Sequence, residues 1–307
     1  MRSERQITDW LKAGALIPKG SQLVLGIGDD CAIYRPRGSE EDLLFTTDLF
    51  VEDVHFRRAT HSPRDVGRVA MARSLSDIAA MGGQPRFVLV SLSVPDWADD
   101  KWVRSFFKAL TVVASEAGAV LAGGDLARSE KLACDVMVCG AVPAGTALRR
   151  DGAKPGDRIY VSGALGGSAL GLEIGTGKAW KRHVSPEPRL ALGRHLRSGL
   201  HATAAMDISD GLSLDLRRLC LASGVSAEIS DPPQFPGAGV ERALHGGEEY
   251  ELLFTVPAKV RVPAAFADVP LTEIGQIVSG QAGLIVHDNK PLAARGYDHF
   301  GRKSGST

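Results

Sequence analysis

The chain has no excess charge of either sign and little cysteine. Lys+Arg and Asp+Glu each number 36 in 307 residues, so the formal net charge is zero. A neutral chain has no broad electrostatic attraction to nucleic acid or to an anionic membrane, so we expect neither partner. The four cysteines (Cys31, Cys134, Cys139 and Cys220) show no CxxC spacing and no accompanying His motif. This pattern argues against a zinc site or a disulfide framework and indicates reduced thiols.

Long apolar runs are also missing. The longest, FVLVSLSV at residues 87–94, is far shorter than the about 20 residues of a membrane-spanning helix. Residues 1–20 carry scattered charges and lack the apolar centre of a secretory signal. We therefore expect a soluble cytoplasmic protein. Its 307 residues exceed the usual size of one hydrophobic core, so two domains are expected.

Familiar catalytic motifs are absent. The chain has no GxxxxGK[ST], no kinase DFG, no GxSxG and no HExxH, and the glycines of 163–177 do not fall as GxGxxG. If this protein uses ATP, it must do so mainly through Mg²⁺ held by aspartates and through backbone amides. Arg149 and Arg150 are candidate phosphate ligands, although without other information a solvated basic turn is the more ordinary interpretation.

Apolar periodicity predicts alternating helices and strands. Helices are expected near the N-terminus and over 63–83, 97–119, 186–199 and 211–224, and strands over 22–28, 42–48, 86–95, 120–125, 132–143, 158–163, 204–207, 225–230, 249–257 and 271–278. The segment 143–157 is rich in Gly, Pro and charge and is the best linker candidate. Two α/β domains, residues 1–147 and 148–307, are the predicted architecture.

Aspartates recur where apolar runs stop. Asp30 follows LVLGIGD, Asp48 follows LLFTT, Asp125 follows VLAGG, and Asp207 and Asp210 lie three apart in MDISDG. One such aspartate is ordinarily a turn former or a helix N-cap. Five that converged would repel one another unless a hard cation lay between them. Mg²⁺ suits this role, because it commonly bridges protein carboxylates to phosphates.

Two further acids have competing interpretations. Asp77 is predicted to lie on a helix one turn after Arg73, so it could join the cluster or form an ordinary surface ion pair. Asp29 precedes Asp30, and we expect one of the two to ligate metal and the other to be structural.

Candidate substrate contacts are less distinctive. His55, in TTDLFVEDVHF, taken alone is more often a structural histidine than a site residue. Glu248 and Glu249 follow two glycines at a predicted strand start, where they could bind a substrate cation or hydroxyl or form a solvated strand entrance.

Eight motifs occur together and in order between about residues 22 and 300, and together they resemble the thiamine-monophosphate kinase family, within the wider aminoimidazole-ribonucleotide-synthetase-like superfamily. The motifs are GIGDDCAIY, TTDLFVEDVHF, SLSDIAAMGG, LAGGD, GAKPGDRIYVSG, MDISDGLSLDL, GGEEYELLFTVP and GYDHF. The resemblance implies a two-domain α/β (α+β) fold, with an N-terminal mixed sheet that dimerises and a C-terminal α/β domain that completes the active site. It implies ATP-dependent phosphorylation of thiamine monophosphate to thiamine diphosphate, in a homodimer with ATP near the dimer interface.

The resemblance also assigns residues. The implied Mg²⁺ ligands are Asp30, Thr46, Thr47, Asp48, Asp77, Asp125, Asp207 and Asp210, of which Asp30 and Asp210 are the main candidates for catalysis. The implied ATP contacts are Gly124, Asp125, Arg150 and Ser209, and the implied thiamine-phosphate contacts are His55, Glu248 and Tyr297. Glu249 stands where the family often has aspartate, so its role is open.

Other members of the superfamily are the nearest alternatives. Selenophosphate synthetase typically has a reactive Cys or selenocysteine in an N-terminal glycine-rich segment, and residues 1–20 here contain no cysteine. The hydrogenase-maturation member ends in a reactive cysteine, whereas this sequence ends GRKSGST. Both differences favour the thiamine assignment. Aminoimidazole-ribonucleotide synthetase is a further alternative with the same fold and use of ATP. A non-catalytic metal- or nucleotide-binding protein would need the same aspartates.

Overall fold

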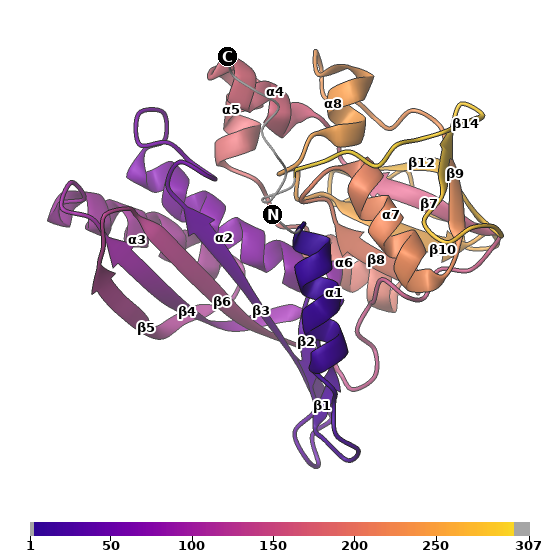
Figure 1. Cartoon of the computed structure of the whole chain (residues 1–307), viewed down its shortest axis with the longest axis horizontal. Coiled ribbons are helices and arrows are strands. Elements are labelled where there is room, and N and C mark those ends of the chain that lie inside the picture. Colours follow the sequence, from indigo (N-terminus) through magenta and orange to yellow (C-terminus); the bar gives the residue numbers. More distant parts are fainter. Residues whose placement is uncertain (1–2, 298–307) are drawn as a thin grey trace.

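The first half of the chain forms a mixed six-stranded sheet with helices on one face (Figure 1). The structure is a computed structural model that describes residues 3–297. The strand order is β1-β2-β3-β6-β4-β5, and only β4 and β5 run parallel. The strands are β1 (Leu23–Leu25), β2 (Ala32–Tyr34), β3 (Glu41–Val51), β4 (Gln84–Val94), β5 (Val120–Arg128) and β6 (Ala133–Pro143). The predicted mixed N-terminal sheet is confirmed.

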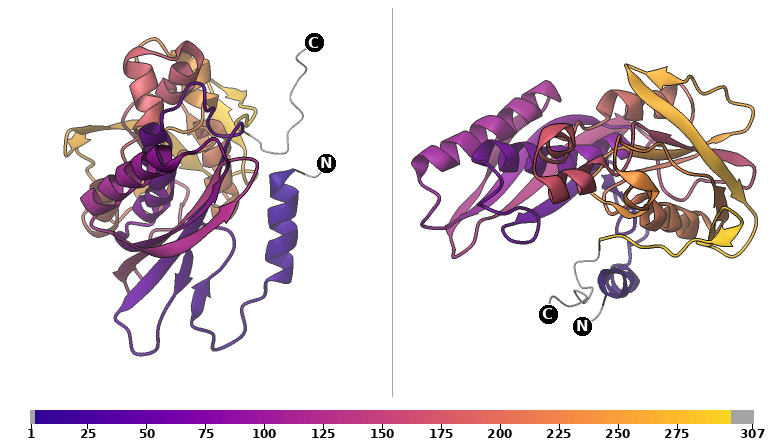
Figure 2. Two further views of the ribbon diagram at one scale, coloured as in Figure 1. Left: turned by 90° about the vertical axis from the view of Figure 1, so that its left-hand side faces the viewer. Right: turned by 90° about the horizontal axis from the view of Figure 1, so that it is seen from above.

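Helices α2 (Pro63–Ala80) and α3 (Asp100–Glu116) cover one face of this sheet. Ser62 caps α2 through a capping box with Asp65, and Pro63 opens the helix, so its start follows from the sequence. We call the opposite face the open sheet face, because no helix of the described chain lies against it in the views of Figures 1 and 2. Helix α1 (Glu4–Gly14) stands apart from the rest, with Trp10 66% exposed.

The second half forms an eight-stranded sheet with strand order β14-β13-β9-β12-β7-β10-β8, and β11 pairs with β12. Its strands are β7 (Asp157–Ser162), β8 (Ala204–Asp207), β9 (Ser226–Ile229), β10 (Leu252–Pro257), β11 (Ala265–Phe266), β12 (Val269–Val278), β13 (Ile285–His287) and β14 (Lys290–Pro291). Its helices are α4 (Gly167–Ile174), α5 (Gly177–Val184), α6 (Leu190–Ser198), α7 (Leu212–Ser223) and α8 (Gly239–His245). Buried side chains of α6, including Leu192 and Leu196, pack with Ala79 and Ala80 of α2 and so join the two halves.

Two expected strand ends are wrong. β3 runs past Asp48 to Val51, and β5 runs past Asp125 to Arg128. Both strands continue because their neighbours pair with them beyond the aspartate, which apolar runs alone do not reveal. The short helices α5 and α8 were not predicted either. The first sheet ends at Pro143 and the second begins at Asp157; the domain boundary at residue 147 lies between them and stays a prediction.

All four cysteines are free and buried. Within residues 3–297, no helix combines the length and apolar character needed to cross a membrane.

Candidate functional site

Three aspartates from distant parts of the chain meet between the two halves. Asp30 lies in the loop after β1, Asp77 lies in the last turn of α2, and Asp207 ends β8. Each offers a carboxylate oxygen, and these oxygens all lie within 4.8 Å of one another. We call these residues the aspartate trio. The convergence that the recurring motif requires is therefore present for two of its five aspartates, Asp30 and Asp207, which the helical Asp77 joins.

Burial and mutual repulsion disfavour the charged form of Asp77 and Asp207 in the trio. Burial raises the pKa of Asp77 well above its usual range, and the neighbouring carboxylates of Asp48, Asp207 and Asp30 raise it further. Burial and the Asp30 carboxylate do the same to the pKa of Asp207. The Thr46 hydroxyl donates to Asp77, and the Ser76 hydroxyl donates to Asp207 at 2.7 Å. A hard oxygen-binding cation fits this donor set, because it would neutralise the repulsion.

The two adjacent aspartates after β1, Asp29 and Asp30, make different contacts. Asp30 accepts hydrogen bonds from the Arg150 guanidinium, with 2.5 Å between Nη2 and Oδ1. Asp29 instead accepts the backbone N–H of Asp30 at 3.0 Å and that of Arg150 at 3.2 Å, which ties the loop to the linker. Burial, then the Asp30 charge, raises the pKa of Asp29 to about 7. Asp29 thus ties its loop to the linker, whereas Asp30 belongs to the trio. Arg150 is largely buried, so the solvated-turn interpretation is wrong for it.

A second group of predicted residues gathers on the loop after β8. The Ser209 carbonyl accepts the N–H of Glu248 at 2.7 Å, and the Asp210 carbonyl accepts the N–H of Tyr297 at 3.1 Å. The Asp210 carboxylate accepts from Arg218 Nη1 at 2.5 Å. Backbone pairing therefore places the expected substrate contacts beside the expected ATP and metal residues. The remainder of the GYDHF motif, residues 298–300, lies outside the described residues.

The N-terminal half supplies the remaining predicted substrate contact. The His55 ring stacks on Phe50 with 5.3 Å between ring centroids. The Arg73 guanidinium also lies 5.3 Å from the Phe50 centroid, and it reaches Asp48 at 3.6 Å and Glu248 at 3.9 Å. His55 and Glu248 are thereby connected across the two halves.

The interpretation of Asp77 as one half of a surface ion pair is wrong. Its side chain is engaged by Thr46 and lies in the trio, whereas Arg73 pairs with Asp48 and Glu248. The helical spacing of Asp77 and Arg73 places them one turn apart, but both face the junction between the halves rather than solvent.

Two predicted metal ligands lie on the other side of the sheet. Thr46 faces α2, so its neighbour Thr47 faces the open sheet face, where its hydroxyl donates to Asp135. Asp125 is exposed on the edge strand β5 and is paired in register with Ser91. Strands β6 and β4 separate β5 from β3. Within one chain, therefore, Asp125 does not join the trio.

Gly124 has a structural role that the sequence did not indicate. Its φ is 151°, and an added Cβ would lie 1.8 Å from the Val90 carbonyl oxygen. Glycine is therefore required for β5 to approach β4. Its expected ATP contact stays a prediction.

Glu249 belongs to a buried network that sequence reasoning missed. Its side chain is fully buried, its Oε1 accepts the Ser168 N–H at 2.9 Å, and its Oε2 lies 3.5 Å from Arg182 Nε. The next acid along, Glu251, accepts from both Arg182 and Arg189. Both a solvated strand entrance and a direct substrate contact are inconsistent with this burial for Glu249. Strand alternation could not have indicated this, because residues 248–251 precede β10 and both Glu248 and Tyr250 have positive φ; the predicted strand start at residue 249 is wrong.

Replacing Glu249 with Gln should flatten the dependence of stability on pH. Burial raises the pKa of Glu249 from 4.5 to about 7. Its contribution to stability is therefore complete below about pH 4.5 and is lost as the pH rises through 7, by up to about 3 kcal/mol. Urea unfolding at pH 5.5 and 8.5 should show a smaller loss for the variant than for the wild type. The exposed Glu241→Gln is the control, and equal losses in all three proteins would contradict the assignment.

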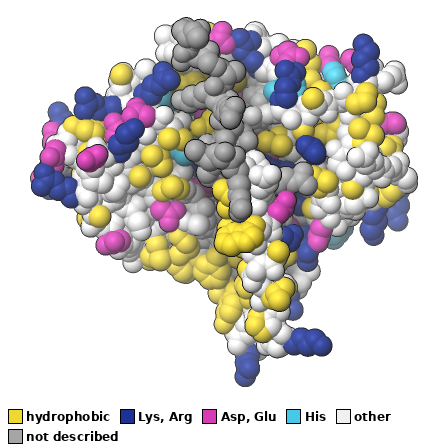
Figure 3. All heavy atoms as spheres, in the orientation of Figure 1, with side chains coloured by type: hydrophobic (Ala, Val, Ile, Leu, Met, Phe, Trp, Pro, Cys, Tyr) yellow, Lys and Arg dark blue, Asp and Glu magenta, His cyan; other side chains and the backbone are white. Residues whose placement is uncertain are grey.

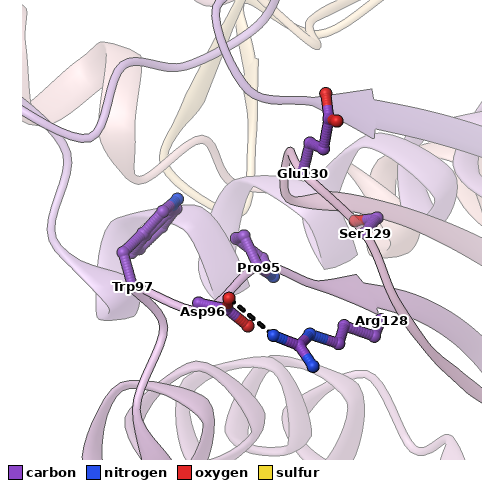
Figure 4. Close-up of a pocket in the computed structure, with 6 residues that line it drawn as sticks. All are labelled: Pro95, Asp96, Trp97, Arg128, Ser129 and Glu130. Atoms are coloured by element: carbon purple, nitrogen blue, oxygen red, sulfur yellow. Dashed lines mark hydrogen bonds and ion pairs between the residues drawn. The ribbon is translucent and has the colours of Figure 1, made fainter.

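A separate surface pocket of about 600 Å³ lies at the far end of β4 and β5 (Figure 4). It is lined by residues 95–97 and 128–130, and the ion pair between Arg128 and Asp96 crosses it at 2.7 Å. Both side chains are more than three-quarters exposed, so the pair contributes little stability. No predicted site residue lines this pocket.

Comparison with known proteins agrees with the geometry. The model of the AIR synthase related protein N-terminal domain matches residues 28–142, and that of the C-terminal domain matches residues 154–287. Thiamine-monophosphate kinase of Escherichia coli (strain K12) is 38% identical, covering 90% of this chain and 92% of the relative. That of Bacillus subtilis (strain 168) is 35% identical, covering 91% and 94%. The chain belongs to the thiamine-monophosphate kinase family.

Solved structures of the family have the same fold. AaThiL complexed with AMPPCP and TMP superposes with a TM-score of 0.86 at 32% identity, covering 98% of this chain and 99% of that one. Thiamine-monophosphate kinase from Stenotrophomonas maltophilia K279a gives a TM-score of 0.76 at 35% identity, covering 92% and 96%. Hydrogenase maturation protein HypE, at 20% identity and a TM-score of 0.69, shares the fold alone. The two-domain fold expected from the motifs is confirmed.

Proposed function

We propose that this protein transfers the γ-phosphoryl group of ATP to the phosphate of thiamine monophosphate, giving thiamine diphosphate and ADP. The observation that carries the proposal is the aspartate trio, because three carboxylates within 4.8 Å, two of them buried, favour a bound cation, and a phosphoryl-transfer site uses one. The family relationship supports the choice of substrates. The N–H groups that place Glu248 and Tyr297 beside Ser209 and Asp210 support one shared site for donor and acceptor.

The reaction needs no nucleophilic side chain. An oxygen of the acceptor phosphate attacks the γ-phosphorus, the bond from that phosphorus to the β,γ-bridging oxygen breaks, and ADP leaves with the electron pair. The acceptor oxygen is already anionic, so no general base is required. When bound, Mg²⁺ supplies charge neutralisation between the two polyanions. Asp30, Asp77 and Asp207 would hold it, with Asp48 and Asp210 next to them.

Arginines of the chain would position the donor. Arg150, already bonded to Asp30, presents a guanidinium that matches phosphate geometry. Arg218 holds the Asp210 carboxylate and that of Asp215, which in turn accepts the N–H groups of Asp210 and Gly211 at the start of α7. These contacts fix the loop that carries Ser209. Alignment of the reactants, rather than activation of a nucleophile, is then the chief contribution of the protein.

The active assembly in this proposal is a homodimer. On the open sheet face, Leu49 and Val120 are 58% and 67% exposed, and Phe87, Leu89 and Met137 are half-buried. Figure 3 shows hydrophobic side chains gathered over this sheet. An apolar face of this kind favours burial against a second copy.

The separation of the predicted ligands supports the same assembly. Three strand spacings of ~4.8 Å place β5 about 14 Å from β3, whereas two ligands of one Mg²⁺ lie only about 4 Å apart. Asp125 and Thr47 could therefore share an ion only if Asp125 came from the other protomer. We further propose a cytoplasmic location, with ATP and thiamine monophosphate as the small-molecule partners.

The deciding assay incubates the protein with ATP, Mg²⁺ and thiamine monophosphate and follows thiamine diphosphate by chromatography. Product should form with thiamine monophosphate and not with free thiamine as acceptor. Asp30→Asn and Asp210→Asn should abolish turnover with the fold intact. Conversion of free thiamine alone would overturn the choice of substrate, and ATP binding without product would indicate a binding protein rather than an enzyme.

A further inference from the structure

Arg73 is a buried cation whose hydrogen-bonding capacity is largely unused. A guanidinium carries five N–H donors. The nearest carboxylate oxygens of Asp48 and Glu248 lie 3.6 and 3.9 Å away, beyond hydrogen-bond length. Within the described part of the chain, its Nε has no hydrogen-bond partner, although the side chain is only 13% exposed. Burying unsatisfied donors on a cation is costly, so this arrangement calls for an acceptor that the protein itself does not supply.

The position of Arg73 identifies which substrate could supply that acceptor. Its guanidinium lies over Phe50, on which His55 also stacks. It reaches Glu248, and Tyr297 lies within electrostatic range of both Arg73 and Glu248. Arg73 thus reaches one expected thiamine-phosphate contact, Glu248, and shares the Phe50 ring with a second, His55. Arg150, by contrast, is hydrogen-bonded to Asp30 of the aspartate trio.

Arg73 also marks the boundary between the acceptor residues and the metal residues. It is one helical turn before Asp77 of the trio, and its other carboxylate neighbour is Asp48. In a transfer reaction the acceptor phosphate must lie between the metal-bound triphosphate and the groups that recognise the organic part of the acceptor. The guanidinium occupies that intermediate place.

We propose that Arg73 is a specificity-determining residue that binds the phosphate of the phosphorylated acceptor and so favours a monophosphate over the free alcohol. This inference rests on the proposed function and deepens it. A guanidinium can donate two parallel N–H groups to one phosphate, an interaction that the unphosphorylated acceptor cannot provide. A site built around an unpaired buried donor discriminates strongly against a ligand that leaves it unpaired.

The test compares two ligands in three variants. Isothermal titration with Mg²⁺ and a non-hydrolysable ATP analogue measures the Kd of thiamine monophosphate and of free thiamine. Arg73→Gln should raise the Kd of thiamine monophosphate by about 10- to 100-fold, the usual effect of losing a charged hydrogen bond, and change that of free thiamine less than about twofold. Arg73→Lys should recover part of the loss. Arg68→Gln, exposed on the same helix, is the matched control and should match the wild type.

Steady-state kinetics gives a second readout. The KM for thiamine monophosphate should rise in Arg73→Gln while the KM for ATP stays constant. Equal weakening of both acceptor ligands, a parallel rise in both KM values, or no change would overturn the inference, because each would leave Arg73 as a structural bridge between Asp48 and Glu248. If the wild-type protein itself neither binds nor phosphorylates thiamine monophosphate, the proposed function fails first. The two failures are therefore distinguishable.

Discussion

Asp77→Asn should lower kcat by about 10³-fold or more and, in the absence of metal, make the protein more stable. Both effects have one cause. The Asp77 carboxylate is buried among Asp48, Asp207 and Asp30, and this environment raises its pKa well above the usual range. Asparagine has nearly the same shape and can still accept from the Thr46 hydroxyl, but it removes a negative charge that Mg²⁺ needs and that the metal-free protein would be more stable without.

The sign of the pH effect provides a further check. The pKa of Asp77 is higher in the folded than in the unfolded protein. The charged carboxylate therefore does not lower the free energy of unfolding at low pH, but it lowers it increasingly as the pH rises through the folded pKa. The stability gain of Asp77→Asn should therefore be larger at high pH. It is measured by urea unfolding in EDTA, with the exposed Asp96→Asn as control.

Magnesium should also raise the Tm of the wild type and of Asp77→Asn by different amounts. Mg²⁺ with a non-hydrolysable ATP analogue should raise the Tm of the wild type, because a ligand that binds only the folded state stabilises it, and should have little effect on Asp77→Asn. A variant that keeps near-normal turnover at saturating Mg²⁺, or that is destabilised in EDTA, would contradict the assignment of the trio as a metal site.

The sequence was sufficient to predict elements whose signals are local. The α2 helix follows from Ser62, Pro63 and its apolar period, and strands such as β6 and β10 follow from apolar runs. Local signals do not show how far a strand continues, because pairing with a neighbour decides that. This is why Asp48 and Asp125 were expected at strand ends and lie within strands.

The candidate site was predictable in composition and not in arrangement. Recurring aspartates indicated a cation site, but only packing between the halves brings Asp30, Asp77 and Asp207 together. Helical spacing offered Arg73 as a partner of Asp77, yet the tertiary contacts of Arg73 are with the other half of the chain. Long-range contacts of this kind leave no local trace in one sequence.

The sequence also did not predict that the expected functional residues would lie on two sides of one sheet. Alternation along β3 puts Thr46 and Asp48 toward α2 and Thr47 toward the open sheet face. A list of expected ligands treats these neighbours alike. The structure shows that they face different surroundings, and this difference is the reason for expecting a second protomer at the site.

A heterodimer that carries Asp77→Asn on one protomer and Asp125→Asn on the other should have about half of the wild-type activity, whereas each variant homodimer should be nearly inactive. If Asp125 serves the site of the opposite protomer, one site of the heterodimer carries both substitutions and the other carries none. Asp125 lies on the edge strand β5, which two strands separate from β3. If Asp125 instead served the site of its own chain, each site of the heterodimer would carry one substitution and the heterodimer would be inactive. Co-expression with two affinity tags isolates the heterodimer, and chromatography of thiamine diphosphate measures its activity. An inactive heterodimer would place Asp125 in the site of its own chain, and an active Asp125→Asn homodimer would remove it from the ligand set.

Val120→Lys, which puts a charge on the open sheet face, should give monomers and abolish activity in the same assay. An active monomer would show that the site is complete without a partner.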